Sequence, residues 1–281
     1  MNDLLKKTQE LCRIYDIKPQ SSMGQNFLVS LEVYKKIVAS ANIKKDEVVL
    51  EVGPGLGFLS AELLKSARKV IAVELDDKLA KVLELALSAH SVDNLEIINE
   101  NILDFDPSIL EADYKIVANL PYNISSVFLR KFLTTKNKPK SLTLMLQKEV
   151  VERIVAEPGK HSLLSLSVQY YSQAKYIDTI KKENFWPQPK VDSAILHLET
   201  KEDKEISLSK EEQKTFFRLL KFGFSAKRKK LVNNLAGALQ VDNEVIETKM
   251  QAVDIDISIR AQGLSLNDWQ KLFAQLRLFM V

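Results

Sequence analysis

Three glycines stand where a strand is predicted to pass into a helix. Gly53, Gly55 and Gly57 directly follow the apolar residues 48–52 and precede a segment whose apolar residues have helical spacing. Glycine lets the backbone turn tightly and approach a ligand with no Cβ in the way. Turns of this kind also occur without a ligand, so the GxGxG pattern alone is a weak indication of a binding site.

Two acidic residues near this turn narrow the class of ligand. Glu74 ends the second predicted strand, 21 residues after Gly53, where a carboxylate can accept hydrogen bonds from both hydroxyl groups of a ribose. Phe58 stands where a dinucleotide-binding turn has its last glycine, which disfavours a pyrophosphate. Glu51 would repel phosphates and tolerate a cation, although it could equally accept hydrogen bonds from backbone amides. We therefore expect the cationic adenosine cofactor S-adenosylmethionine.

The tetrapeptide Asn119-Leu120-Pro121-Tyr122 follows the fourth predicted strand and suits methyl transfer to an adenine amino group. That nitrogen is a poor nucleophile because its lone pair is delocalised into the ring. The Asn119 side-chain oxygen and the Leu120 carbonyl could accept its two N–H bonds and favour a pyramidal nitrogen aimed at the methyl group. Tyr122 would stack on the base. A helix-capping Asn or a core Tyr is common when it occurs alone. The four residues in this order favour a role in methyl transfer over a purely structural turn.

A second aromatic element, Phe185-Trp186-Pro187-Gln188-Pro189, precedes the last predicted strand. Its two prolines stiffen the loop in an extended form. Phe185 is predicted to hold an extruded base against Tyr122. The alternative is a hydrophobic plug at the edge of the sheet, which we favour for Trp186.

The strands that must position these residues are predicted from apolar, β-branched runs. They cover residues 48–52, 70–75, 95–98, 116–118, 142–146, 163–171 and 193–198. A helical segment between the first two predicts a parallel βαβ unit, and continuous apolar strands suit a sheet that is covered on both faces. The fold class is α/β, with a Rossmann-like sheet of seven strands.

A second domain is predicted after Thr200. At about 150 residues per domain, 281 residues predict two domains. The charged stretch that follows Leu198 has no strand pattern and leads into helical patterning up to the end of the chain. We expect a methyltransferase domain over residues 1–200 and a small helical domain over 201–281.

A local excess of positive charge lies in this second domain. The net charge is only +3, but residues 213–241 hold seven basic and no acidic residues. A solvated helix face would explain a few of these cations, whereas seven in 29 residues favour contacts with phosphates. The residues predicted to contact phosphates are Lys221, Lys227, Arg228, Lys229 and Lys230.

Other sites are not indicated. Cys12 is the single cysteine, and His90, His161 and His197 lack the spacing of zinc ligands. The longest apolar runs fall short of the roughly 18 residues of a membrane span, and the first ten residues do not resemble a signal peptide. We expect a cytoplasmic protein with no metal and no membrane partner.

Six motifs occur in order along the chain: GQNFL at 24–28, EVGPGLGFLS at 51–60, VELD at 73–76, NLPYNIS at 119–125, FWPQPKVDS at 185–193 and KRKKLVNNL at 227–235. In this set and order the chain resembles the small-subunit (16S) ribosomal RNA adenine N6-dimethyltransferases of the bacterial KsgA type. The resemblance implies that two adjacent adenines in a hairpin loop near the 3′ end of that RNA each receive two methyl groups. It also implies that the second domain, residues 201–281, binds RNA through its predicted phosphate-contacting residues. A monomer with a role in small-subunit biogenesis is implied as well.

The resemblance also implies how the cofactor is held. Asn26 and Leu28 would cover it, Gly53 would contact its methionine portion, and Glu74 its ribose. Asn119 would lie beside both cofactor and target base. The position that binds the cofactor's adenine is Asn101, where the family usually has Asp, and the nearby Asp104 is an alternative partner for that adenine.

Three other functions compete with this one. Large-subunit ribosomal RNA methyltransferases of the antibiotic-resistance type usually have NIPY instead of NLPY and lack the KRKKLVNNL segment. A non-catalytic RNA-binding assembly factor would not need the intact element 119–122. A nicotinamide-dependent dehydrogenase would need a proton-relay residue near the turn, and the sequence offers none.

Overall fold

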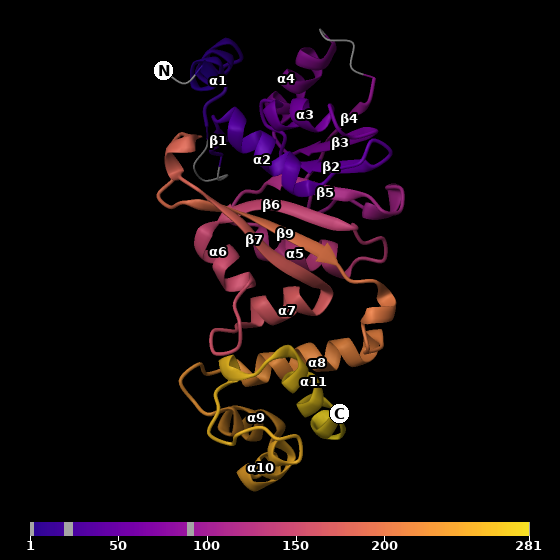
Figure 1. The fold of residues 1–281 in the computed structure, drawn as a ribbon, viewed down its shortest axis with the longest axis vertical. Helices are drawn as coiled ribbons and strands as arrows, with labels where there is room; N and C mark the ends of the chain where they lie inside the picture. Colours follow the sequence, from indigo (N-terminus) through magenta and orange to yellow (C-terminus); the bar gives the residue numbers. More distant parts are fainter. Residues whose placement is uncertain (1–2, 20–24, 89–92, 281) are drawn as a thin grey trace. The chain divides into compact units, whose positions relative to one another are not determined.

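The computed structural model describes residues 3–19, 25–88 and 93–280 (Figure 1). Gly24 of the first motif and His90 lie outside the described residues. The chain divides into two compact units, one made of residues 1–151 and 173–200 and the other of residues 152–172 and 201–281.

The first unit is built on a seven-stranded sheet in the order β4-β3-β2-β5-β6-β9-β7. Its strands are β2 (Val48–Val52), β3 (Lys69–Glu74), β4 (Leu95–Asn99), β5 (Lys115–Asn119), β6 (Ser141–Gln147), β7 (Ser172–Ile180) and β9 (Ser193–Thr200). The five neighbouring strands β4, β3, β2, β5 and β6 run parallel to one another. The strand β9 runs antiparallel to β6. The parallel strands therefore end at one common edge of the sheet, as the βαβ pattern predicted.

One predicted strand is wrong. Residues 163–171 form helix α7 (Leu163–Tyr171) and the seventh strand is β7, which follows it directly. The helix begins with a reciprocal cap, in which the Ser162 hydroxyl accepts from the Ser165 backbone and the Ser165 hydroxyl accepts from the Ser162 backbone. The strand β7 was missed because it lies at the sheet edge and is largely polar.

Helices cover the sheet of the first unit. They are α1 (Asp3–Ile14), α2 (Leu31–Ala41), α3 (Phe58–Leu63), α4 (Asp77–Ser88), α5 (Ser125–Thr134) and α6 (Lys148–Ile154), with short 3₁₀ turns η2 (Pro107–Ile109) and η3 (Lys182–Asn184). The helix α2 packs on β5, β6 and β9, while α4 packs on β3 and β4. Every residue of β2 is buried, which agrees with a sheet covered on both faces.

The second unit is helical. It contains α7, α8 (Lys210–Gly223), α9 (Leu231–Leu239), α10 (Asn243–Gln251) and α11 (Leu266–Leu276), with 3₁₀ turns η4 (Asp203–Glu205), η5 (Ala261–Gly263) and η6 (Arg277–Phe279). Its core includes the fully buried side chains of Phe216, Trp269 and Leu272. Residues 152–172, which the sequence analysis assigned to the first domain, join this unit because α7 packs against α8 and α11.

We predict that Gly223→Ala destabilises the protein, although alanine is normally the better helix residue. A Cβ on Gly223 would overlap the ring of Trp269, which is fully buried, and would lie 3.0 Å from the Leu231 side chain. Overpacking of this kind costs about 1 to 3 kcal/mol of unfolding free energy, which urea unfolding would measure. Gly237→Ala is the matched control, because nothing lies near that glycine, and it should be neutral or stabilising. Equal stability of the two variants would contradict this packing.

Candidate active site

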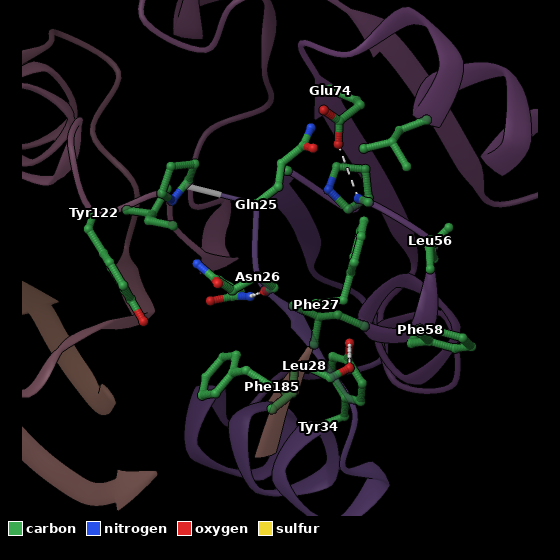
Figure 2. Close-up of a pocket in the computed structure, with 18 residues that line it drawn as sticks. Gln25, Asn26, Phe27, Leu28, Tyr34, Leu56, Phe58, Glu74, Tyr122 and Phe185 are labelled. Carbon is green, nitrogen blue, oxygen red and sulfur yellow. Dashed lines mark hydrogen bonds between the residues drawn. The ribbon is translucent and has the colours of Figure 1, made fainter. Parts of the chain in front are cut away.

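A cavity lies at the edge of the sheet where the parallel strands end (Figure 2). It is lined by eight residues predicted from the sequence, namely Asn26, Leu28, Gly53, Glu74, Asn119, Leu120, Tyr122 and Phe185. These residues come from five separate stretches of the chain. The fold thus brings together the predicted cofactor-binding and base-binding residues.

The glycine turn forms one wall of the cavity and holds Glu74. Gly53, Gly55 and Gly57 have φ angles of 64°, 57° and 80°, which L side chains rarely adopt. One carboxylate oxygen of Glu74 accepts the Gly55 backbone N–H at 3.1 Å, and the other accepts the Asp76 backbone N–H at 3.0 Å. The carboxylate is fixed in this way, and each oxygen keeps lone-pair capacity for a ligand hydroxyl group.

Glu51 lies in β2, just before the turn, and is fully buried. Among the described residues, its carboxyl oxygens have no hydrogen-bond partner, and the same holds for the buried Ser60 hydroxyl. Burial raises the pKa of the Glu51 carboxyl to about 8; the nearby Ser60 opposes the rise and the Glu74 carboxylate adds to it. Glu51 is therefore an acid that holds its proton at neutral pH unless a cation approaches.

A short ribbon of two strands joins distant parts of the chain over the cavity. The strand β1 (Phe27–Leu28) pairs antiparallel with β8 (Phe185–Trp186). The Tyr34 hydroxyl donates to the Leu28 carbonyl at 2.8 Å and supports this ribbon from α2. Phe185 is thus held in a strand and largely buried, whereas the sequence predicted a stiff loop that presents it. Trp186 packs in a hydrophobic cluster with α1 and α4, in agreement with its predicted role as a plug.

The end of β5 and the residues that follow it form the opposite wall of the cavity. The Asn119 amide nitrogen donates to the Asn26 carbonyl at 3.5 Å, which leaves the side-chain oxygen as the end that can accept from a ligand. The Leu120 backbone N–H donates to the Met145 carbonyl at 3.2 Å and fixes the next peptide to β6. The Tyr122 hydroxyl lies 2.9 Å from the Ser193 hydroxyl.

Asn101 is the one predicted cofactor-binding residue that does not line this cavity. It follows the end of β4, which pairs with the Glu74 strand β3. Its side-chain oxygen accepts the Leu103 backbone N–H at 3.0 Å, and its amide nitrogen donates to Asp104 at 2.9 Å. Both ends of the Asn101 amide are thus engaged within the loop.

The predicted RNA-binding residues Lys221, Lys227, Arg228, Lys229 and Lys230 are all exposed in the second unit. Lys229 also lines an open groove together with Asn233 and Gln240. Two other cations of the basic segment are engaged within the protein. Lys214 pairs with Glu211 at 2.9 Å, and the Arg218 guanidinium donates to the Met280 carbonyl. These two cations are already used within the protein, so fewer than the seven counted in the sequence are available to contact phosphates.

Several lining residues were missed by the sequence analysis. They are Gln25, Phe27, Tyr34, Pro54, Leu56, Leu59 and Leu79, whereas Gly55, Phe58 and Pro121 were already named with the glycine turn and the tetrapeptide. Those next to a motif residue, such as Phe27, could have been found by extending the motif. Tyr34 has no such signal, because it reaches the cavity from the core-facing side of α2.

The described part of the chain contains neither a metal-binding cluster nor a membrane-spanning helix. No group of three or more His, Cys, Asp or Glu side chains there could hold a metal ion. No helix within residues 3–19, 25–88 and 93–280 is both long enough and apolar enough to span a membrane.

The sequence pattern that defines the family "Ribosomal RNA adenine dimethylase" matches residues 17–277. A protein of Dehalococcoides mccartyi (strain CBDB1), "Ribosomal RNA small subunit methyltransferase A", is 42% identical over 272 residues, which cover 96% of this chain and 92% of that protein. A protein of the same name from Clostridium botulinum (strain Langeland) is 36% identical, with 94% of this chain and 96% of that protein covered.

Solved structures of similar proteins have the same fold. A dimethyladenosine transferase from Plasmodium falciparum superposes with a TM-score of 0.77 at 26% identity and covers 88% of this chain and 96% of that one. The 23S rRNA methyltransferase ErmE superposes with a TM-score of 0.74 at 25% identity and covers 90% of this chain and all of the other. The α/β fold with a helical C-terminal region is therefore confirmed.

We predict that Glu51 makes the folded protein less stable as the pH rises. Its pKa is about 8 in the folded protein and about 4.3 in an unfolded chain, so between these values the folded state binds more protons and raising the pH favours unfolding. The Glu51→Gln variant lacks this titration. The two pKa values correspond to roughly 3 to 4 kcal/mol of wild-type stability lost between pH 5 and pH 8. The melting temperature of the variant, measured relative to that of the wild-type protein, should therefore rise by several degrees or more over this range.

Thermal unfolding at pH 5, 6.5 and 8 measures this difference. Glu74 is mostly buried and its pKa is also raised by burial, so the variant should keep part of the wild-type slope. Parallel melting curves for both proteins across this range would show that Glu51 is ionised in the folded protein.

Proposed function

This chain belongs to the ribosomal RNA adenine dimethylase family, and from that premise we propose that it methylates small-subunit (16S) ribosomal RNA. The reaction transfers methyl groups from S-adenosylmethionine to the N6 atoms of two adjacent adenines in a hairpin loop near the 3′ end. The observation that carries the proposal is that Glu74 and the element 119–122 line one cavity.

The charges of the cavity fit S-adenosylmethionine. Glu74 is held by two backbone N–H groups and can accept from the ribose hydroxyl groups. Glu51 does not line the cavity, but its buried carboxyl lies two residues before Gly53 and would favour a positively charged ligand if it lost its proton. Asn26 and Leu28 would cover the cofactor, and Gly53 would contact its methionine portion. The bound cofactor would supply an electrophilic methyl group.

The adenine contact of the cofactor is proposed to lie beyond β4, at the loop that contains Asn101 and Asp104. The amide oxygen of Asn101 accepts the Leu103 N–H and keeps one lone pair, whereas Asp104 accepts from Asn101 through one of its two oxygens and so keeps more acceptor capacity. This arrangement favours Asp104 as the acceptor for the adenine amine.

The residues after β5 would activate the target amine. The Asn119 oxygen and the Leu120 carbonyl accept its two N–H bonds, which localises the lone pair on the nitrogen. The bonds of Asn119 to Asn26 and of Leu120 to Met145 hold these acceptors in place before the base arrives. Tyr122 and Phe185 would hold the extruded ring. No dedicated base is needed, because the methylated ammonium loses its proton to water.

The partner is proposed to be small-subunit ribosomal RNA or its precursor particle in the cytoplasm, where the chain would also serve small-subunit biogenesis. Hairpin loops offer unstacked bases, which lowers the cost of extrusion. The exposed cations from Lys227 to Lys230, with Lys221, would contact phosphates. The similarity to ErmE supports a second candidate, methylation of large-subunit RNA. The greater identity to small-subunit enzymes favours the first candidate.

The proposal predicts that the purified protein converts adenine to N6-dimethyladenine in undermodified small ribosomal subunits. Asn119→Ala should lower kcat about 100-fold or more, because a preorganised acceptor in a closed site contributes this much. Labelled cofactor, followed by nucleoside analysis of both ribosomal subunits, measures it. Label in large-subunit RNA alone would favour the second candidate. Full activity of Asn119→Ala would refute the assigned chemistry.

Removing cations from the basic segment should weaken RNA binding in a salt-dependent way. Each phosphate contact contributes about 0.7 to 0.9 to the slope of log K against log salt concentration. The double variant Arg228→Ala/Lys229→Ala should therefore lower that slope by about 1 to 2. Lys214→Ala is the matched control, because Lys214 already pairs with Glu211. If the control and the double variant lose the same slope, the segment acts only through net charge.

A further inference from the structure

A pair of hydroxyl groups connects the element 119–122 to the first residue of β9. The Ser193 hydroxyl lies 2.9 Å from the Tyr122 hydroxyl. Ser193 is fully buried and starts β9 opposite Gln147 of β6, so its position is set by the sheet. Tyr122, by contrast, lines the cavity from the turn that follows β5 (Figure 2).

This hydrogen bond limits how the tyrosine ring can move. The turn itself is tied by the Ser125 hydroxyl, which donates to the Tyr122 carbonyl at 3.1 Å. With its backbone and its hydroxyl both held, the ring is fixed at two ends. The ring then presents a constant surface to the cavity, in which Phe185 also lies.

We propose that Ser193 is a positioning residue that fixes the Tyr122 ring as one wall of the slot for the target adenine. The Tyr122 hydroxyl is then an anchor and takes no part in proton transfer. This inference rests on the proposed function, since it assumes that the slot receives the base. Its physical basis is that a ring already ordered does not have to lose rotamer freedom when the base stacks on it.

Three variants and a control test the proposal. Ser193→Ala and Tyr122→Phe each remove the hydrogen bond, and both should lower kcat/KM for the RNA about three- to tenfold. The double variant should be no worse than either single variant, because both changes remove the same interaction. The affinity for S-adenosylmethionine should stay within twofold in all three, and the pH profile of kcat should keep its shape.

Thr143→Val is the matched control. Thr143 is also fully buried, and its hydroxyl lies 2.9 Å from Nδ1 of His197, a pair that ties β9 to β6 and whose residues do not line the cavity. This variant should lose as much thermal stability as Ser193→Ala but keep its kcat/KM. If Ser193→Ala changes only the melting temperature, or if the effects of the two single variants multiply, the proposal is overturned. A pH profile that loses a limb in Tyr122→Phe would also overturn it.

A binding measurement separates this proposal from the proposed function. A small-subunit RNA hairpin that carries 2-aminopurine at a target position reports stacking by its fluorescence, whether or not methyl transfer occurs. The wild-type protein and Thr143→Val should change the fluorescence equally, and Ser193→Ala should change it less. Absence of methylation with this contrast intact would refute the reaction and keep the positioning role. Equal fluorescence of all the proteins would refute the positioning role.

Discussion

The parallel register of β2 with β3 and β5 is the constraint on which the site depends. Val52 lies opposite Val73 on one side and Ala118 on the other. The next residue of each strand is therefore Gly53, Glu74 or Asn119, and all three reach the same edge of the sheet. A slip of one residue would turn their side chains to the other face. The many apolar contacts of these buried strands thus fix the positions of a few polar groups.

Much of this edge could be predicted from the sequence, because its signals are local. A buried apolar run followed by Gly53, or ended by Glu74 or Asn119, indicates both the strand and the residue it presents. The pairing of β1 with β8 could not be predicted, since each strand has two residues and they lie far apart in the sequence. The helix α7 was misread because its apolar run fits a strand as well, and only the reciprocal serine cap marks its start.

The polar groups in and next to the cavity differ in how far the protein itself satisfies them. Glu74, Asn119 and Tyr122 are each held by a hydrogen bond from or to another part of the fold. Glu51 and Ser60 do not line the cavity; they are buried in β2 and α3, before and after the glycine turn, with no such bond among the described residues. The first group is preorganised, so its side chains need no further ordering when a ligand binds. The second group leaves buried polar atoms without a partner, and at neutral pH the Glu51 carboxyl keeps its proton for this reason.

The ribbon of β1 and β8 places Leu28 directly opposite Phe185, so the residue proposed to cover the cofactor and the residue proposed to hold the base share one pair of backbone strands. A displacement of either residue by its ligand would therefore be passed to the other. If both proposed roles hold, the binding of cofactor and that of RNA would be coupled, and thermodynamic linkage would require each to change the affinity of the other by the same factor.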